Sequence, residues 1–262
     1  MRRWSVVLAA VAVLGALVPF EAGAQRSQGL VKILSDVRGA YNKQERPVVI
    51  FDLDGTIFDN RPRTLTILRE YADEQLASVR PDAAAVIRKM TPQQVRYQLT
   101  ETLVGAGVTE NAVVNNAAVF WSERFFKDEY LKYDKPVAGV VAYVRTLYSN
   151  GARVVYLTGR DAPRQLIGTV RALRDNGFPI GIQGTELIMK PTSKTQDAIF
   201  KQQVTNYLRH YGKVIATFDN EPANANVFRR AFPSATVVVF DAPHSPNPPP
   251  LLPKVDQVAS FE

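Results

Sequence analysis

The chain has 262 residues, of which 46% are hydrophobic and 22% are charged, a composition typical of a globular protein rather than a disordered, collagen-like or coiled-coil chain. Because it contains no cysteine and only two histidines, it cannot form a disulfide scaffold, use a thiolate nucleophile or build a metal site of several histidines. Its formal net charge is +7, but it has no run of five or more basic residues, so nucleic-acid binding has no local support.

The first 24 residues are typical of a secretory signal peptide. Arg2 and Arg3 make a basic start, an apolar run covers residues 5–18, and small residues precede a cleavage point after Ala24. We therefore expect an exported protein, periplasmic or secreted, from which residues 1–24 are removed. The apolar run is short for a membrane span, so no stable membrane anchor is expected; an uncleaved anchor is the alternative.

The rest of the chain alternates helical and strand patterns. Residues 29–41 have apolar side chains at helical spacing, and residues 48–51 form a continuous apolar run typical of a strand buried on both faces. Further strands are predicted at residues 153–157, 186–189, 214–218 and 236–240, and helices at residues 136–149, 163–176 and 195–210. This alternation predicts an α/β fold built on a doubly wound parallel sheet.

One long segment interrupts the alternation. Residues 62–133 contain no clear strand and are too long for a loop in a compact sheet, so we expect a helical insertion over the end of the first strand. Its helices are predicted at residues 63–79, 82–90, 92–103 and 110–130, with start signals such as Pro81-Asp82. Residues 25–61 and 134–262 then form the α/β core. The proline-rich tail, residues 241–253, is expected to wrap the surface without a central strand or helix.

Polar side chains follow several of the predicted strands. Asp52 and Asp54 come after the first strand, Thr158 after the next and Asp219 after a later one. In doubly wound sheets, ligands bind beyond these carboxyl ends of the strands. Crowded carboxylates repel one another unless a cation lies between them, and a set of oxygen ligands suits Mg²⁺. The sequence therefore predicts a Mg²⁺ site at this edge of the sheet.

These residues also resemble a known family. Asp52-Leu53-Asp54-Gly55-Thr56 is similar to the first motif of the haloacid dehalogenase superfamily, and Thr158 and Asp219 resemble its second and fourth motifs in the same order. The resemblance covers nearly the whole chain after the signal peptide. It implies a Rossmann-like core with a helical cap, here residues 62–133, inserted after the first core strand.

The resemblance implies a role for each motif residue. Asp52 would be the nucleophile that forms an aspartyl phosphate, and Asp54 the general acid and then the general base. An Asp at the second position is typical of the phosphatases and mutases of the superfamily. Asp52, the carbonyl group of Asp54, and Asp219 would hold Mg²⁺.

Three residues in a row are expected to contact the phosphate or the substrate. Thr158 would donate a hydrogen bond to the phosphoryl oxygens, and Gly159 and Arg160 follow it directly. For Arg160 a structural ion pair is the alternative. The fourth motif departs from the commoner form, because Asn220-Glu221-Pro222 follows Asp219, and Asn220, Glu221 and Asn224 all remain candidates for a further contact with the metal.

A lysine is expected to stabilise Asp52 and the transferring phosphoryl group. Lys201 is favoured, because Phe200-Lys201 lies eleven residues before Gly212 and so resembles an element of acid phosphatases in the superfamily. Lys190 and Lys194 remain open as alternatives.

The function implied is that of a Mg²⁺-dependent phosphomonoester hydrolase of the acid phosphatase type, exported from the cytoplasm. The alternatives are a phosphomutase of the same superfamily and a non-catalytic binding protein on the same fold. The partner expected is a small phosphorylated substrate, with nucleotides among the candidates. The insertion is rich in aromatic residues, which form either the core of the cap or a wall for stacking a ring: Phe120, Trp121, Phe125, Phe126, Tyr130 and Tyr133.

Overall fold

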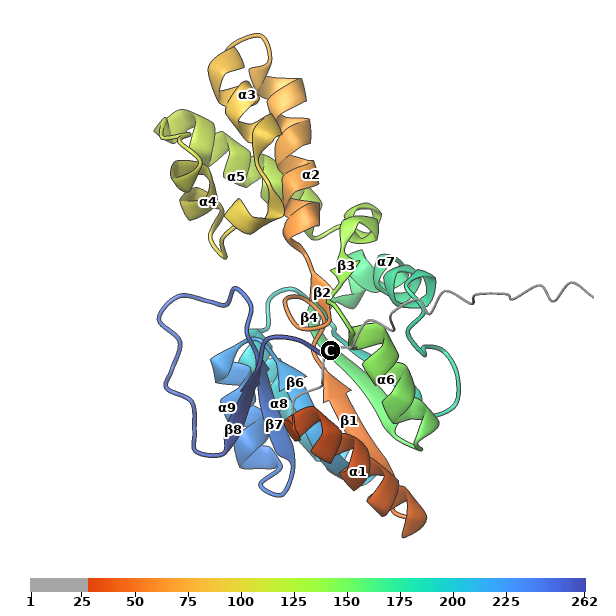
Figure 1. The fold of residues 1–262 in the computed structure, drawn as a ribbon. Helices are drawn as coiled ribbons and strands as arrows, with labels where there is room; N and C mark the ends of the chain where they lie inside the picture. The colour runs from red at the N-terminus through yellow and green to blue at the C-terminus, as the bar shows by residue number, and fades with distance from the viewer. Residues whose placement is uncertain (1–27) are drawn as a thin grey trace, which may run out of the picture.

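A computed structural model describes residues 28–262, so the predicted signal peptide lies outside the described residues. The central element is a six-stranded sheet in the order β5-β4-β1-β6-β7-β8, in which all neighbouring strands are parallel (Figure 1). Its strands are β1 (Pro47–Phe51), β4 (Arg153–Asp161), β5 (Thr185–Lys190), β6 (Lys213–Asp219), β7 (Thr236–Phe240) and β8 (Val255–Val258). This arrangement confirms the predicted α/β class with a doubly wound parallel sheet.

Helices cover both faces of the sheet. Val49 and Phe51 of β1 belong to the apolar cluster that includes side chains of α1 (Gln28–Asn42), α6 (Val140–Ser149) and α7 (Ala162–Asp175). Val48 and Ile50, which alternate with them, belong to the cluster formed with α8 (Asp197–Tyr211) and α9 (Pro222–Ala231). Because both faces of β1 are buried, its sequence is a continuous apolar run rather than an alternating one.

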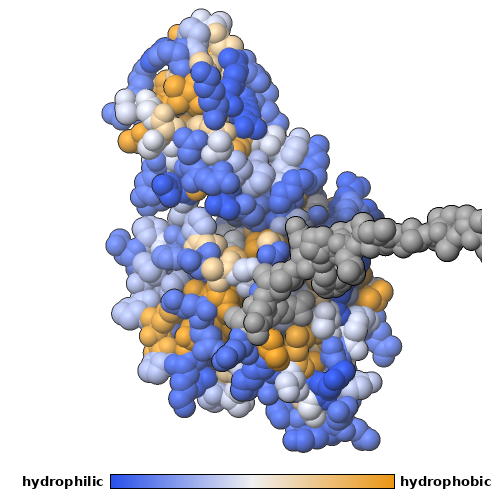
Figure 2. Space-filling view, viewed as in Figure 1, coloured by the Kyte–Doolittle hydropathy of each residue, from blue (hydrophilic) through white to orange (hydrophobic). Residues whose placement is uncertain are grey.

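The segment after β1 forms a group of helices beyond the carboxyl end of that strand (Figure 1). It contains α2 (Arg61–Tyr71), a π-helical turn (Ala72–Leu76), α3 (Pro81–Lys89), α4 (Leu99–Gly105), α5 (Asn111–Phe125) and 3₁₀ turns at Pro92–Gln94 and Asp128–Tyr133. These helices share an apolar core of their own, in which Leu68, Ala84 and Ala117 are fully buried. In the space-filling view they form an upper lobe, set off from the sheet by a recess (Figure 2).

A short antiparallel ladder joins the two lobes. It pairs β2 (Phe58–Asp59) with β3 (Lys135–Pro136), at the points where the chain enters and leaves the helical lobe. The helix predicted from residue 136 therefore begins only at Val140, after Gly139 has turned the chain with a φ of 74°. The two crossings lie side by side, so the helical lobe is attached through a narrow double connection.

Two helices of this lobe differ from the prediction. The segment 92–103 does not form one helix, because the chain is extended at Val95, which is buried, and Arg96 N donates a hydrogen bond to Thr102 Oγ1. The segment 110–130 stops being α-helical at Phe125, whose carbonyl oxygen accepts a hydrogen bond from Arg63 Nη1.

The proline-rich tail runs without helix or strand from Asp241 to Pro253, as expected, and is tied to the core by side chains. Asn226 of α9 donates to Pro250 O and accepts from Leu252 N at 2.9 and 2.8 Å. After the tail the chain adds β8 to the edge of the sheet, a strand that was not predicted. Within residues 28–262, no helix combines the length and the apolar character that crossing a membrane requires.

The end of the chain closes one side of the core. Phe261 is fully buried, and its ring centroid lies 5.6 Å from that of Tyr143, 5.5 Å from Phe218 and 5.2 Å from Phe240.

We predict that Phe261→Ala lowers the free energy of unfolding by about 3–5 kcal/mol, because the lost ring leaves a cavity between helix and sheet. Urea unfolding measures this. Tyr207→Ala, at a site 49% exposed, serves as the control, with an expected change below about 1 kcal/mol. Equal losses in both variants would contradict the packing role of Phe261.

Candidate active site

The loop after β1 turns sharply at Gly55. This residue has a φ of 77°, and a Cβ built on it would lie 2.4 Å from Nδ2 of Asn220, so only glycine fits. The turn is closed by the hydrogen bond from Gly55 N to Phe58 O, and Asp52 N donates to Phe218 O of the neighbouring strand. As a result, Asp52 and Asp54 lie at the edge of one cavity, although only one residue separates them.

A buried lysine joins two carboxylates from different strands. Lys201 of α8 is 1% exposed, and its Nζ donates to Asp52 Oδ1 and to Asp219 Oδ2, both at 2.6 Å. We call Asp52, Lys201 and Asp219 the carboxylate–lysine nest. Burial opposes the charged form of Lys201, but Asp219 and Asp52 together hold its pKa above the ordinary value. The pKa of Asp52 is raised to about 8: burial is the largest cause, Lys201 opposes it, and Asp219 adds to the rise because two carboxylates share one ammonium group.

The side chains of Asn220, Glu221 and Asn224, which follow Asp219, point in different directions. Asp219 Oδ1 accepts hydrogen bonds from Glu221 N at 2.9 Å and from Asn224 Nδ2 at 3.1 Å. The carboxylate of Glu221 is turned to the tail, where it accepts from Ser245 N at 3.0 Å. Asn220 donates to Pro243 O and lies against the Gly55 turn. Of the three candidates for a further metal contact, Asn224 is therefore the one whose side chain bonds to Asp219.

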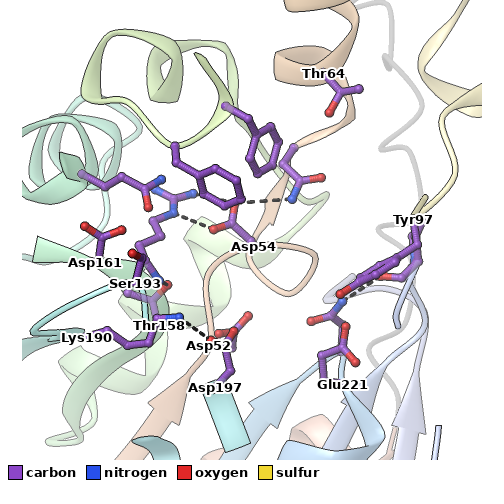
Figure 3. A pocket seen from close by; sticks show the side chains of 18 of the residues that line it. Asp52, Asp54, Thr64, Tyr97, Thr158, Asp161, Lys190, Ser193, Asp197 and Glu221 are labelled. Carbon is purple, nitrogen blue, oxygen red and sulfur yellow. Dashed lines mark hydrogen bonds and ion pairs between the residues drawn. The ribbon is translucent and has the colours of Figure 1, made fainter. Parts of the chain in front are cut away.

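Thr158 and its neighbours form the opposite side of the nest. Thr158 and Gly159 line the same cavity as Asp52 (Figure 3), and Thr158 Oγ1 accepts a hydrogen bond from Arg160 N at 3.2 Å. A Cβ on Gly159 would lie 2.1 Å from Asp197 Oδ2, so a side chain here would have to displace the Asp197 carboxylate at the start of α8.

The three candidate lysines differ in where they lie. Lys201 is in the nest. Lys190 lines the cavity, but its Nζ donates to Asp197 Oδ1 at 2.7 Å and to Thr195 O at 3.1 Å. Lys194 is exposed and does not line the cavity. The arrangement brings Lys201 alone of the three into contact with Asp52, which is the geometry expected of the stabilising lysine.

Four charged side chains meet where the core joins the helical lobe, and we call them the junction cluster: Asp54, Arg63, Asp134 and Arg160. Arg160 Nε and Nη2 donate to the two oxygens of Asp54 at 2.7 and 2.9 Å, and Nη2 also donates to Asp134 Oδ2 at 2.8 Å. Arg63 of α2 pairs with Asp54 and, at 2.9 Å, with Asp134. Two positive and two negative charges thus balance one another in a buried position.

The junction cluster sets the charge state of Asp54. Burial alone would raise its pKa, but Arg160 and then Arg63 hold the pKa of this carboxyl well below its usual range. Asp134 is more deeply buried, and burial raises its pKa to about 6 despite the same two arginines. Arg160 is fully engaged, since its Nη1 also donates to Thr169 Oγ1 at 3.3 Å. The structure therefore shows the ion-pair arrangement for Arg160, at the wall of the cavity.

A cavity of about 600 Å³ lies between the core and the helical lobe. In the close view, Asp52, Asp54 and Thr158 surround it, with Tyr97 of the helical lobe and Glu221 of the core at its other side (Figure 3). The helical lobe contributes mainly aromatic and basic residues: Arg61, Thr64, Val95, Arg96, Tyr97, Trp121, Phe125 and Phe126. The cavity is of the size that small-molecule ligands occupy in proteins.

The nest fits the binding of a divalent cation. When both are ionised, Asp52 and Asp219 outnumber the single ammonium group of Lys201, and a cation would balance the remaining negative charge and so oppose the rise in the pKa of Asp52. The donors are all oxygens, as Mg²⁺ prefers. Within residues 28–262 no three His, Cys, Asp or Glu side chains are grouped to hold a metal, so a third protein ligand would be another kind of oxygen, such as the carbonyl of Asp54 or the side-chain oxygen of Asn224.

Sequence comparison identifies the family. A family model of haloacid dehalogenase-like hydrolases matches residues 47–191, more than half of the chain, and the chain therefore belongs to this family. This confirms the resemblance seen in the motifs and identifies the protein as a hydrolase. A search of curated protein sequences found no significant match.

Comparison with solved structures supports the fold. A protein from Clostridium difficile assigned as a phosphatase is 15% identical, with a TM-score of 0.51 over 78% of this chain and 89% of that one. Protein tyrosine kinase A (PtkA) of Mycobacterium tuberculosis is 18% identical, with a TM-score of 0.50 over 83% and 95%. The class C acid phosphatase of Bacillus anthracis is 13% identical, with a TM-score of 0.44 over 75% and 61%, too distant to support the acid phosphatase branch.

Arg63 and Asp134 were not predicted from the sequence as site residues. These two residues lie near the points where the chain enters and leaves the helical lobe. Each is one charged residue among many, and nothing in its neighbourhood distinguishes it from a solvated charge. Both are nevertheless buried, because the two crossings pack against Asp54 and Arg160. Because these charges are paired in a buried position, removing one of them should destabilise the fold.

We predict that Asp134→Asn lowers the free energy of unfolding by about 3–5 kcal/mol, because it leaves an arginine charge uncompensated in a buried position. Asp175→Asn is the matched control: this carboxylate pairs with Arg174 on the surface with both side chains at least 60% exposed, and the expected change is below about 1 kcal/mol. Urea unfolding of both variants decides the point. An Asp134→Asn protein as stable as the control would show that the junction cluster does not depend on its charge balance.

Proposed function

We propose that the protein is a Mg²⁺-dependent phosphomonoester hydrolase of the acid phosphatase type, exported from the cytoplasm, that works through an aspartyl phosphate on Asp52. The observation that carries the proposal is the buried nest of Asp52, Lys201 and Asp219, of which Asp52 and Lys201 line, with Thr158, a cavity between the core and the helical lobe. Export is supported only by the composition of residues 1–24.

In the proposed reaction the carboxylate of Asp52 attacks the phosphorus atom, and the ester oxygen leaves with a proton from Asp54. In the second half, Asp54 takes a proton from water, and the water oxygen attacks the phosphorus of the aspartyl phosphate. The products are the alcohol and inorganic phosphate, and Asp52 is restored.

The surroundings of Asp54 suit its role in the second half of the reaction, the hydrolysis of the aspartyl phosphate. The arginines of the junction cluster keep its carboxylate ionised, which is the form that accepts a proton from water. For the first half Asp54 must carry a proton. A phosphate group bound beside it favours the protonated form, because it brings further negative charge close to the carboxylate.

The remaining residues of the site bind and hold the phosphoryl group. Lys201 and the Thr158 hydroxyl are placed to donate hydrogen bonds to its oxygens as charge moves during transfer. Mg²⁺, when bound by Asp52, Asp219 and the Asp54 carbonyl, would supply a Lewis acid and offset the repulsion between Asp52 and the phosphate. The helical lobe lines the side of the cavity that faces the core and would limit the access of water to a bound substrate.

The first prediction from this proposal concerns the nucleophile. Asp52→Asn should abolish release of inorganic phosphate from a panel of nucleotides, sugar phosphates and aryl phosphates, because an amide cannot form the aspartyl phosphate. The purified wild-type protein with Mg²⁺ should release phosphate, and a chelator should stop the release until Mg²⁺ is restored. Asp36→Asn, an exposed position on α1, is the control. Turnover by Asp52→Asn would remove the nucleophile from the proposal, and phosphate returned only to the substrate would indicate a mutase.

The second prediction concerns the lysine. Lys201→Ala should lower the rate by at least about a hundredfold, since it removes the cation that faces both Asp52 and the phosphoryl oxygens. Lys194→Ala should leave the rate unchanged, and Lys190→Ala should reduce it less, because Lys190 is bonded to Asp197 rather than to the nest. Steady-state rates, with thermal unfolding to check the fold, compare the three. If the large loss occurs in Lys190→Ala instead, Lys201 is not the stabilising lysine.

A further inference from the structure

Three aromatic side chains at the end of α5 form one side of the cavity, and we call them the aromatic wall: Trp121, Phe125 and Phe126. The rings of Trp121 and Phe125 are stacked, with centroids 4.3 Å apart and an angle of 29° between the planes. Phe126 meets both edge-on, at 5.8 Å from Trp121 and 5.1 Å from Phe125. All three line the cavity that also holds Asp52 and Asp54. They are therefore a continuous apolar surface within the candidate active site.

The aromatic wall differs from the core of the helical lobe. Phe120, one turn earlier in α5, is buried and packs on Tyr71, with ring centroids 5.4 Å apart. Trp121 and Phe125 contact that core but are only partly buried, and Phe126 keeps 36% of its surface exposed. The lobe thus fills its own core with other side chains and leaves these rings partly uncovered towards the cavity.

The position of the wall relates it to the leaving group. The guanidinium of Arg63 pairs with Asp54 and lies 3.9 Å from the centroid of the Phe125 ring, while its Nη1 donates to Phe125 O at 3.0 Å. In the proposed function Asp54 gives its proton to the ester oxygen, so the alcohol part of a bound ester begins beside Asp54. One guanidinium group separates that point from the aromatic wall.

The ring of Phe125 lies between the ring of Trp121 and the guanidinium of Arg63, so the wall offers a ligand chiefly the rings of Trp121 and Phe126. The indole Nε1 of Trp121 already donates to Thr64 Oγ1 at 3.2 Å, so the ring offers a ligand only its face and edge. Arg61 is paired with Asp59 and Arg164 with Asp161, whereas Arg96, which also lines the cavity, forms no ion pair within residues 28–262. A ligand here gains from an aromatic ring, which stacks on such surfaces, more than from a saturated chain of the same size.

We infer that the substrate is a phosphomonoester whose alcohol carries a planar aromatic ring, which lies against Trp121 and Phe126 of the aromatic wall while the phosphate lies in the carboxylate–lysine nest. This inference rests on the proposed function and names its substrate class. The ring can belong to a simple aromatic alcohol or to the base of a nucleotide, since both present the same flat face.

The test compares two esters that differ only in the ring. Benzyl phosphate and cyclohexylmethyl phosphate have the same number of carbon atoms and both release a primary alcohol, so the chemical step is similar and the flat ring is the main difference. For the wild-type protein the KM for benzyl phosphate should be lower by about threefold to tenfold, the range expected for one aromatic contact. Adenosine 5′-phosphate, as a third substrate, distinguishes a nucleotide base from a simple aromatic alcohol.

Substitutions in the aromatic wall test whether it causes the lower KM for aromatic esters. Phe126→Leu keeps an apolar side chain at a partly exposed position, so the fold should be retained, and it should raise the KM for benzyl phosphate or adenosine 5′-phosphate by about threefold to tenfold. The rise for the cyclohexylmethyl ester should be clearly smaller. Tyr207→Leu, an exposed aromatic on α8 that does not line the cavity, is the matched control and should change none of the three values.

The outcomes separate this inference from the proposed function. Equal KM values for the two ring-matched esters, or an effect of Phe126→Leu that is the same on both, would overturn the aromatic substrate class while phosphate release still supports the hydrolase. Release of phosphate from glycerol phosphate but from neither benzyl phosphate nor adenosine 5′-phosphate would also overturn the aromatic substrate class and leave the hydrolase supported. No release from any ester in the presence of Mg²⁺ would overturn the proposed function, and the inference with it.

Discussion

The site depends on one ammonium group that holds two carboxylates together. Lys201 reaches from α8 to Asp52 at the end of β1 and to Asp219 at the end of β6, and all three side chains are almost completely buried. Two carboxylates in so little water repel each other strongly, and the lysine reduces that repulsion without cancelling it. When both carboxyl groups are ionised, one negative charge is left over, and a bound cation would offset it. The parallel sheet makes this meeting possible, because it brings the ends of strands far apart in the sequence to one edge.

Much of this could be predicted from the sequence, because the information is local. Asp52, Asp54, Thr158 and Asp219 each follow directly on an apolar run, and the order of the runs places them at one edge of the sheet. The choice of Lys201 came from the resemblance of Phe200-Lys201, eleven residues before Gly212, to an element of acid phosphatases. A side chain whose place depends on the end of its own strand or helix can be located without knowledge of the rest of the fold.

Other features depend on contacts that no local pattern records. Helix α9 was not predicted, because its sequence has two asparagines at positions where a helix usually has apolar residues. Both are buried and form hydrogen bonds: Asn224 donates to Asp219, and Asn226 donates to Pro250 O in the tail. Strand β8 has four residues and gains its place only by pairing with β7 after the proline-rich tail. Arg63 and Asp134 are buried only because both crossings to the helical lobe meet Asp54.

The two motif aspartates consequently depend on different parts of the molecule. The side chain of Asp52 is bonded by Thr56 and Lys201, which belong to the core. Asp54 is bonded by Arg160 of the core, but also by Asn60 and Arg63, at the start of the helical lobe. A shift of that lobe would therefore leave the nest intact and alter the surroundings of Asp54. In the proposed reaction, attack on phosphorus is then prepared by the core alone, whereas proton transfer to the leaving group requires the helical lobe in place. The aromatic wall lies on the same lobe as Arg63, and Phe125 contacts that arginine directly, so the proposed leaving-group surface and a residue that holds the proposed proton donor are packed together.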